Sequence, residues 1–203
     1  MIQSLFLRPA ARLFVIVIVV VMAQGLGLVV SGRAADKQLL MLAGRPSHGY
    51  LEHEYRAGCL LLQRCLADTP GLRVTVVSND WPSDESVFQR ADAVFMFCTG
   101  GDGHPANQPK RLQLLGSLMA KGVGFGTCHY GVEVPKGAAG DAFLEWQGGY
   151  FEMYWSVNPH WTAKYEKFPD HPISRGVQPF EINDEWYYPV SYTHLTLPTI
   201  LRV

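Results

Sequence analysis

The chain has 203 residues, with 17 Lys and Arg against 18 Asp and Glu and a formal net charge of −1 at pH 7. This balance argues against nucleic acid or an acidic membrane surface as the main partner, because both select strongly basic proteins. Once the two unusual ends described below are set aside, about 155 residues remain, enough for one domain core.

The first 34 residues are typical of a secretory signal peptide. Arg8 and Arg12 precede an apolar segment at 13–30, and small residues follow, so cleavage is expected after Ala34 or Ala35. Loss of Arg8, Arg12 and Arg33 leaves 14 basic residues against 18 acidic ones, a net charge near −4. We therefore expect a periplasmic or extracellular protein. The alternative is a retained membrane anchor, because about 18 apolar residues can just span a bilayer.

The other end, residues 190–203, resembles one reading frame of a sequencing adapter. We expect the native domain to occupy residues 37–189 and to be incomplete at its C-terminus, and we assign no function to the tail. The alternative is an ordinary strand rich in Thr and Leu.

Between these ends, strand and helix patterns alternate. Short apolar runs predict parallel strands buried on both faces, and longer amphipathic runs predict the helices between them. Ser83 is the expected N-cap of a short helix, residues 143–161 are aromatic-rich and expected to be irregular, and a later strand is expected at 180–188. The predicted sheet strands are 38–43, 72–78, 93–98 and 122–128, and the main helices are 52–67 and 107–121.

This order predicts an α/β fold with a flavodoxin-like, doubly wound parallel sheet and right-handed crossovers. Ligands of such sheets bind beyond the carboxyl ends of the strands, where the strand order changes direction. The loops after the first, third and fourth strands are therefore the expected site.

Histidines and carboxylates gather on these three loops. His48, Tyr50, His53 and Glu54 follow the first strand, His104 follows the third, and His129, Tyr130 and Glu133 follow the fourth. Imidazoles serve as metal ligands or as proton carriers near neutral pH. His48, His53 and Glu54 are compatible with a divalent metal of the zinc or manganese type. Taken singly, each histidine could instead be bonded to backbone.

Cys128 lies where the fourth strand ends, in a segment similar to the nucleophile elbow of class I glutamine amidotransferases. The closing glycine is one position late, and a buried thiol is the simpler interpretation of Cys128. The four cysteines are not spaced like a disulfide framework, so free thiols are expected.

Several short motifs resemble the ThuA-like (trehalose utilisation) family. The resemblance covers roughly residues 38–188 and implies the class I glutamine amidotransferase-like fold. In that family histidine usually stands at the elbow, which makes His129 the matching position, and the family is linked to trehalose and oxidised-sugar breakdown. The motifs are Ser47-His48-Gly49, His53-Glu54, Gly101-Asp102-Gly103-His104-Pro105, His129-Tyr130-Gly131, Gly148-Gly149-Tyr150-Phe151, Asn158-Pro159-His160, Asp170-His171-Pro172-Ile173 and Asp184-Glu185-Trp186-Tyr187.

The sequence thus favours a carbohydrate-active hydrolase or isomerase for a trehalose-like disaccharide or a keto-sugar. His129 is the expected acid/base, with Glu133 or Glu152 as its carboxylate partner. One cleft is expected to hold the sugar-contacting residues, which are His48, Tyr50, His104, Tyr130 and Trp155. The alternatives are a non-catalytic sugar-binding module of an envelope protein and a glutamine amidotransferase that uses Cys128.

Overall fold

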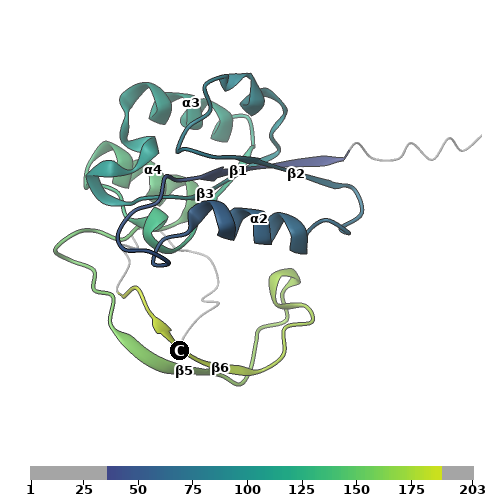
Figure 1. The fold of residues 1–203 in the computed structure, drawn as a ribbon, viewed down its shortest axis with the longest axis vertical. Coiled ribbons are helices and arrows are strands. Elements are labelled where there is room, and N and C mark those ends of the chain that lie inside the picture. The colour runs from purple at the N-terminus through teal and green to yellow at the C-terminus, as the bar shows by residue number, and fades with distance from the viewer. Residues whose placement is uncertain (1–35, 189–203) are drawn as a thin grey trace, which may run out of the picture. The chain divides into compact units, whose positions relative to one another are not determined.

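Four parallel strands form the central sheet of the computed structural model, which describes residues 36–188 (Figure 1). The strands are β1 (Lys37–Ala43), β2 (Leu72–Val77), β3 (Ala93–Phe97) and β4 (Gly124–Thr127), in the order β2-β1-β3-β4. Every neighbouring pair is parallel, so the predicted doubly wound sheet is confirmed, with its change of direction between β1 and β3. The predicted signal peptide at 1–34 and the tail at 190–203 lie outside the described residues.

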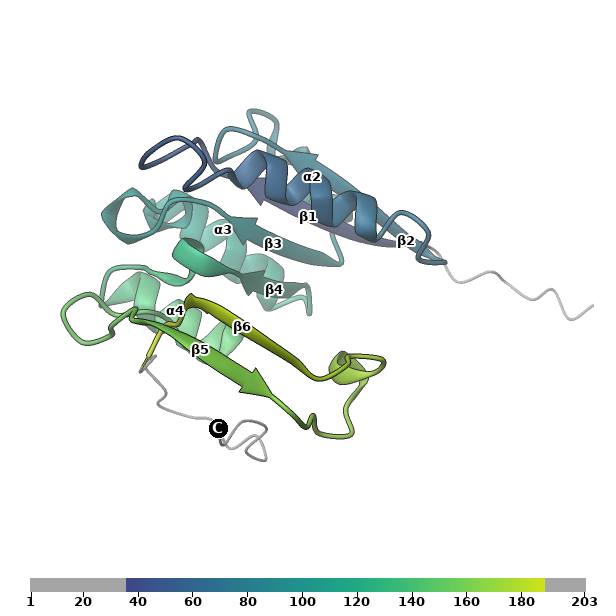
Figure 2. The ribbon, with the colours of Figure 1, turned by 60° about the horizontal axis from the view of Figure 1, so that its bottom comes forward.

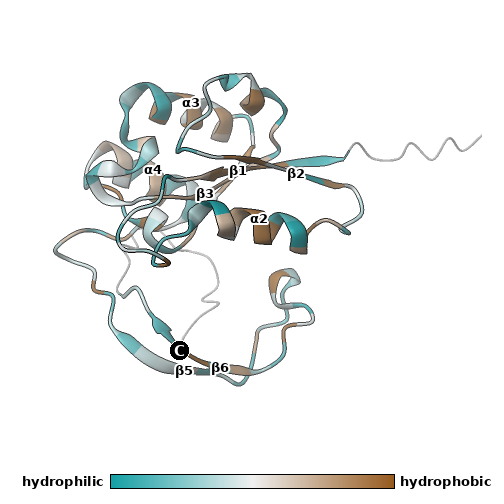
Figure 3. Cartoon of the chain, viewed as in Figure 1, coloured by the Kyte–Doolittle hydropathy of each residue, from teal (hydrophilic) through white to brown (hydrophobic). Residues whose placement is uncertain are grey.

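Strand β1 has apolar residues at successive positions because both of its faces are buried. Leu40 and Leu42 belong to the hydrophobic cluster on one face of the sheet, whereas Met41 and Ala43 belong to the cluster on the other. Successive side chains of a strand point to opposite faces, so covering both faces requires an apolar residue at every position. Figure 3 shows this hydrophobic colouring along much of the sheet.

The helices divide between the two faces. Helix α2 (Tyr55–Cys65) packs on the face of Met41 through Tyr55 and Cys59. The 3-10 helix η1 (Glu85–Arg90), α3 (Pro109–Met119) and α4 (Ala138–Gln147) pack on the other face. Figure 1 shows α2 and α3 on opposite sides of the sheet. We refer below to the α2 face and the α3 face.

After α4 the chain forms a separate antiparallel hairpin of β5 (His160–Tyr165) and β6 (Phe180–Glu185) (Figure 2). Aromatic rings hold its strands together; the centroids of Tyr165 and Phe180 lie 4.8 Å apart and those of Trp161 and Trp186 lie 5.5 Å apart. Backbone hydrogen bonds then join Val157 to Tyr188 in both directions, at 2.7 and 2.8 Å. The residues that follow β6 therefore pair with the residues that precede β5.

The structure corrects four details of the sequence prediction. The segment expected to be irregular contains the end of α4 and the start of β5, and β6 ends at Glu185 rather than at residue 188. Helix α2 begins at Tyr55, because a bridge between Ser47 and His53 holds the preceding loop. The N-cap of η1 is Asp84, not Ser83, since the Asp84 carboxylate accepts from the backbone N–H of Ser86 at 2.9 Å. Among residues 36–188, no helix is long and apolar enough to cross a membrane.

Candidate functional site

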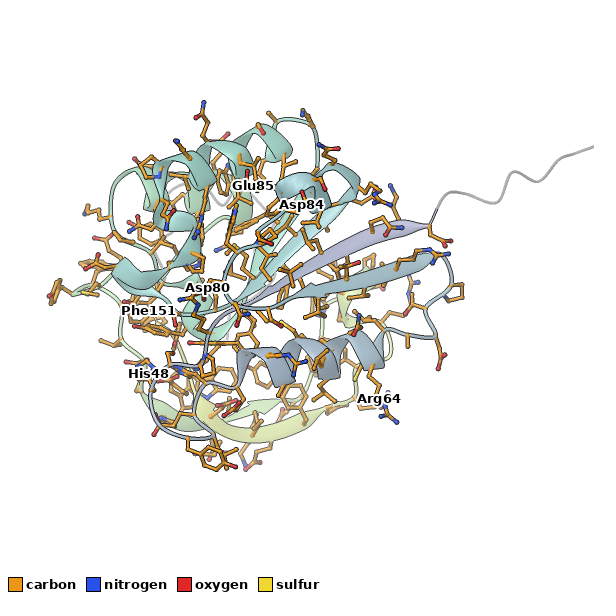
Figure 4. All side chains as sticks on the ribbon, turned by 45° about the horizontal axis from the view of Figure 1, so that its top comes forward. His48, Arg64, Asp80, Asp84, Glu85 and Phe151 are labelled. Carbon is orange, nitrogen blue, oxygen red and sulfur yellow. The ribbon has the colours of Figure 1, made fainter. Side chains whose placement is uncertain are left out.

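The carboxyl ends of the parallel strands carry the candidate site, as the fold predicts. Figure 4 shows His48 and Asp80 at this end of the sheet, with Arg64 at the opposite end of α2. His48 and His53 lie on the loop after β1, and His129 and Tyr130 lie on the short helix η4 (His129–Val132) after β4. The loops that the sequence analysis selected therefore do meet.

Two imidazoles face each other at the centre of this arrangement. Nε2 of His53 lies 3.0 Å from Nε2 of His129, and the ring centroids are 4.9 Å apart. Hydrogen bonding at this distance requires one nitrogen to donate a proton and the other to accept it. We call these two residues the imidazole pair.

Hydroxyl groups hold the second nitrogen of His53. Its Nδ1 lies 3.0 Å from Ser47 Oγ and 3.0 Å from Tyr55 Oη. Ser47 Oγ also lies 3.1 Å from His48 Nδ1, which joins the third histidine to the same network. Burial first, and then the charges of His48 and His129, lower the pKa of His53 below its ordinary value. His53 is thus disposed to be neutral near pH 7.

A strained turn presents His129. Its φ of +50° lies in the left-handed region that L-residues seldom occupy, directly after β4. This is the geometry of an elbow that lifts one side chain out of the sheet edge. The His129 side chain remains 35% exposed, and its Nδ1 lies 3.5 Å from Glu185 Oε2 at the end of β6.

Aromatic rings surround the imidazole pair. The ring of Tyr130 lies 5.3 Å from that of His48 and 5.3 Å from that of His53, and the ring of Tyr187 lies 5.8 Å from that of His129. Burial first, and then the carboxylates of Glu185 and Glu133, raise the pKa of Tyr187 far above its ordinary value. The aromatic rings give the site apolar surface next to its proton-carrying groups, a combination suited to sugar rings.

Glu133 is buried close to these rings. Burial first, and then the charge of Asp102, raise the pKa of Glu133 above its ordinary value. Glu133 in turn helps to raise the pKa of Tyr130, after the larger effect of burial. A carboxyl group of raised pKa beside tyrosines is one form that a general acid takes in proteins. The structure therefore keeps Glu133 within the candidate site.

His104 does not share this surface. Its side chain is 2% exposed, its Nδ1 accepts from the backbone N–H of Ala106 at 3.0 Å, and its Nε2 lies 3.1 Å from the carbonyl oxygen of Gly131. Its ring packs against Phe143 on the α3 face, and burial lowers its pKa from 6.5 to about 4. These contacts give His104 a structural role, and its expected part in sugar binding stays a prediction.

Three other predicted positions are exposed or occupied by other contacts. The Glu152 carboxylate accepts from Tyr150 Oη at 2.8 Å and pairs with Lys136 at 2.9 Å. Tyr50 and Trp155 point largely into solvent, at 89% and 64% exposure. Glu152 is thus engaged by groups other than the histidine it was expected to assist.

The predicted metal ligands do not assemble. The Glu54 carboxylate faces the backbone N–H of Leu51, at 3.4 Å, just before α2. Within residues 36–188, no group of three or more His, Cys, Asp or Glu side chains is arranged to hold a metal ion. His48 and His53 instead share hydrogen bonds with Ser47 Oγ.

The cysteines do not favour amidotransferase chemistry. All four are free, and burial raises the pKa of the Cys128 thiol to about 12. Cys98 is buried 3.4 Å from His104 Nε2, and its pKa is raised well above the ordinary value for the same reason. A nucleophilic cysteine needs a depressed pKa, and here the shift has the opposite sign.

A polar cavity of about 400 Å³ opens beside the buried histidine, on the α3 side of the same sheet edge. The Asp80 carboxylate accepts from the Arg45 backbone N–H at 2.8 Å and pairs with its guanidinium at 3.2 Å, while the Arg111 guanidinium stacks on Trp81 at 4.9 Å. Arg45, Asp80 and Arg111 thus have partners within the protein. The lining of the cavity includes Arg45, Asp80, Trp81, Asp102, His104 and Arg111.

The sequence analysis gave no role to Ser47, Tyr55, Glu185 or Tyr187, which the structure joins to the imidazole pair. Glu185 and Tyr187 belong to a motif that was recognised only as a resemblance. Their contact with His129 depends on the return of the β5–β6 hairpin, for which the sequence carries no local signal. The position of Ser47 next to His48 was the one available hint.

Comparisons with known proteins agree with this fold. Residues 39–202 match the profile of the ThuA family, described as trehalose utilisation. The chain is also similar to the 2.30 Å crystal structure of a ThuA-like protein from Bacteroides uniformis, at 14% identity and a TM-score of 0.55. That match covers 77% of this chain and 62% of the other, so this chain spans less than two thirds of that protein. No curated protein matches the sequence.

Proposed function

This chain belongs to the ThuA family, described as trehalose utilisation, and on that premise we propose that it acts on a trehalose-like disaccharide or a keto-sugar. The imidazole pair is the acid–base group of the reaction, and His129 is its substrate-facing member. The family supports the substrate class. The reaction type, either hydrolysis or isomerisation, follows from what positioned proton carriers do at glycosidic and carbonyl groups.

The observation that carries this proposal is the pair itself. Two imidazoles 3.0 Å apart, one of them on a strained turn at the carboxyl edge of the sheet, are costly to maintain for stability alone. Glu133 supplies a nearby carboxyl group of raised pKa, and Tyr130 and Tyr187 supply rings for a sugar face. A sugar seated there would meet both a proton donor and a proton acceptor.

Turnover assays with the full chain test the proposal. Trehalose and a panel of keto-sugars are incubated with the protein, and products are followed by proton NMR. His129→Asn should lower kcat by about 100- to 10,000-fold, the usual contribution of a general acid–base group. His171→Asn, on the loop between β5 and β6, is the matched control and should keep full activity, since its Nδ1 only accepts from the backbone N–H of Ile173.

Exposed aromatic rings favour a second candidate, a sugar-binding module without turnover. Trp155 is 64% exposed and Tyr154 is 99% exposed, and such rings are common saccharide platforms. Calorimetric binding of the same sugars separates the two candidates. An enzyme loses turnover but keeps binding in His129→Asn, whereas a binding module shows no turnover in either protein and loses affinity in Trp155→Ala.

We also propose that the protein works outside the cytoplasm, on the strength of the N-terminal sequence pattern. Fractionation of a bacterial host that expresses the full chain tests this. A shortened protein in the periplasm or medium is the expected result, and a full-length membrane-bound product would favour the anchor instead.

A further inference from the structure

The acidic-aromatic motif at residues 184–187 ends β6 beside the imidazole pair, and Glu185 is its member closest to His129. Its carboxylate is held from both sides. Asn158 Nδ2 donates to Oε1, and Oε2 lies 3.5 Å from His129 Nδ1. The backbone N–H of Trp186 donates to the Pro159 carbonyl oxygen at 3.0 Å, which fixes the segment that carries Glu185 against the segment that carries Asn158.

This arrangement decides where the proton of a neutral His129 resides. An ionised carboxylate only accepts, so Glu185 favours a proton on Nδ1 of His129 and leaves Nε2 with a lone pair. Nε2 of His53 must then donate across the 3.0 Å contact. Nδ1 of His53 becomes an acceptor, and it faces the hydroxyls of Ser47 and Tyr55, both of which can donate. Every nitrogen of the pair thus has a partner of the correct kind.

We propose that Glu185 is a positioning residue: it holds the His129 proton on Nδ1, so that His53 and His129 share one proton between their Nε2 atoms and act as a single acid–base unit. Asn158 orients Glu185, and Ser47 and Tyr55 orient His53. The catalytic consequence rests on the proposed function, whereas the assignment of protons does not.

The proton balance of the unit follows from the same contacts. In the neutral unit each ring carries one proton. When one proton enters at Nδ1 of His53 from the Ser47 side, the proton on Nε2 of His53 moves to Nε2 of His129, and His129 becomes the cation beside Glu185. Release of that proton to a substrate oxygen leaves a neutral unit in which both rings carry their proton on Nδ1. The starting unit is restored when a proton returns to the Nε2 side of the pair and the Nδ1 proton of His53 leaves through the Ser47 hydroxyl. A second added proton would place two N–H groups against each other, so the contact would break.

The charged groups around the pair favour one added proton and oppose a second one. Glu185 and Glu52 favour a positive charge on His53, while His48 and His129 oppose a second one. The titratable groups around the unit are His48, Glu52, Tyr55, Tyr130, Glu133, Glu185 and Tyr187.

Nitrogen NMR of the isotope-labelled full chain tests the proton assignment without any substrate. His129 should show the Nδ1–H tautomer and His53 the Nε2–H tautomer. In Glu185→Gln the His129 signal should move toward a mixture of tautomers. Glu181→Gln, on the same strand but paired with Lys164 at 3.0 Å, is the control and should leave both histidines unchanged.

Kinetics provide the second readout. Glu185→Gln should lower kcat by about 10-fold or more with KM within about twofold, because the substrate still binds while the proton is misplaced. Asn158→Ala should cause a smaller loss of the same kind and serves as the second variant if Glu185→Gln unfolds.

The outcomes separate this inference from the proposed function. If no sugar is turned over but the tautomers are as assigned, the proposed reaction fails and the proton unit stands. An Nε2–H tautomer for His129 in the wild-type protein, or identical spectra for Glu185→Gln and wild type, would overturn the role of Glu185. A stoichiometric metal ion bound by both Nε2 atoms would overturn the shared proton.

Discussion

Two histidine environments lie at the same edge of the sheet, on opposite faces, and they differ in what surrounds each ring. On the α3 face His104 is buried, bonded to the Ala106 N–H and the Gly131 carbonyl, and packed on Phe143. On the α2 face His53 and His129 face each other, with His129 partly open to solvent. Strand alternation produces this division, because neighbouring positions at the end of β3 point to opposite faces.

The comparison shows that loop position alone does not identify a catalytic histidine. His104 follows β3 at the sheet edge where ligands of such folds bind, but both its nitrogens are already engaged with backbone. Nδ1 caps the turn between β3 and α3, and Nε2 contacts the Gly131 carbonyl oxygen after β4. The imidazole pair uses its nitrogens on side chains, which can exchange protons, rather than on backbone groups, which cannot. The partner of each nitrogen therefore separates structure from chemistry here.

The largest expected effect is a difference in the free energy of unfolding between variants at the two histidine environments. His104→Ala should lower the free energy of unfolding by about 3–4 kcal/mol, because a buried ring and two hydrogen bonds are lost. His129→Ala should cost about 1 kcal/mol or less, since its ring is partly exposed. Urea denaturation followed by circular dichroism measures both. Equal losses at the two positions would contradict the division.

His104 should also make the free energy of unfolding depend on pH, by an amount similar to the loss expected for His104→Ala. Its folded pKa of about 4 lies below its unfolded value of 6.5, so the unfolded state binds the extra proton first. Its contribution is complete above pH 6.5 and is lost as the pH falls through the range between 6.5 and about 4, by roughly 3 kcal/mol in all.

Unfolding of wild type and His104→Asn at several pH values isolates this contribution. Asn preserves an N-cap acceptor for Ala106 but does not titrate, so the stability difference between the two proteins should shrink as the solution is acidified. A difference that is constant from pH 7 to pH 4 would show that His104 is accessible to protons in the folded state.

A smaller loss of stability is expected for a substitution at Gly100, which is closely packed against Tyr130 and Glu133. A Cβ at Gly100 would meet the backbone oxygen of Tyr130 and would lie 2.9 Å from the Glu133 Cβ. Gly100→Ala should therefore cost about 1–3 kcal/mol and displace the turn that carries His129. In the control Gly116→Ala, the new Cβ would meet Trp146 at an ordinary 3.5 Å, so this helical substitution should be neutral or stabilising. Thermal unfolding of both variants measures the contrast.

The smallest expected effect concerns backbone strain. Because His129 has a φ of +50°, His129→Gly should be about 1 kcal/mol more stable than His129→Ala. At His104, with a φ of −60°, the order should reverse and Ala should be favoured over Gly. Calorimetric unfolding of the four variants tests the pair of comparisons, and the same order at both positions would remove the argument for a strained elbow.

The sheet could be predicted because its signals are local. The apolar run at β1 and the alternation of strands and helices specify a parallel sheet with both faces covered, and the structure has the predicted strands within two residues at each boundary. Helix α4 was missed because its segment is rich in Ala, Gly and aromatic residues, without a marked amphipathic pattern. Strand β5 was missed because it pairs only with β6 and is largely exposed.

By itself, the sequence determined the class of fold, the family, and the loops at which His48, His53 and His129 come together, since these follow from hydrophobic periodicity and from short motifs. The tertiary structure decided which groups face those histidines. It directed His104 to the α3 face, turned Glu54 toward the Leu51 N–H, and returned Glu185 from a distant hairpin to His129. The physical reason is that burial and hydrogen-bond partners depend on packing between segments far apart in the chain, for which no local pattern of residues exists.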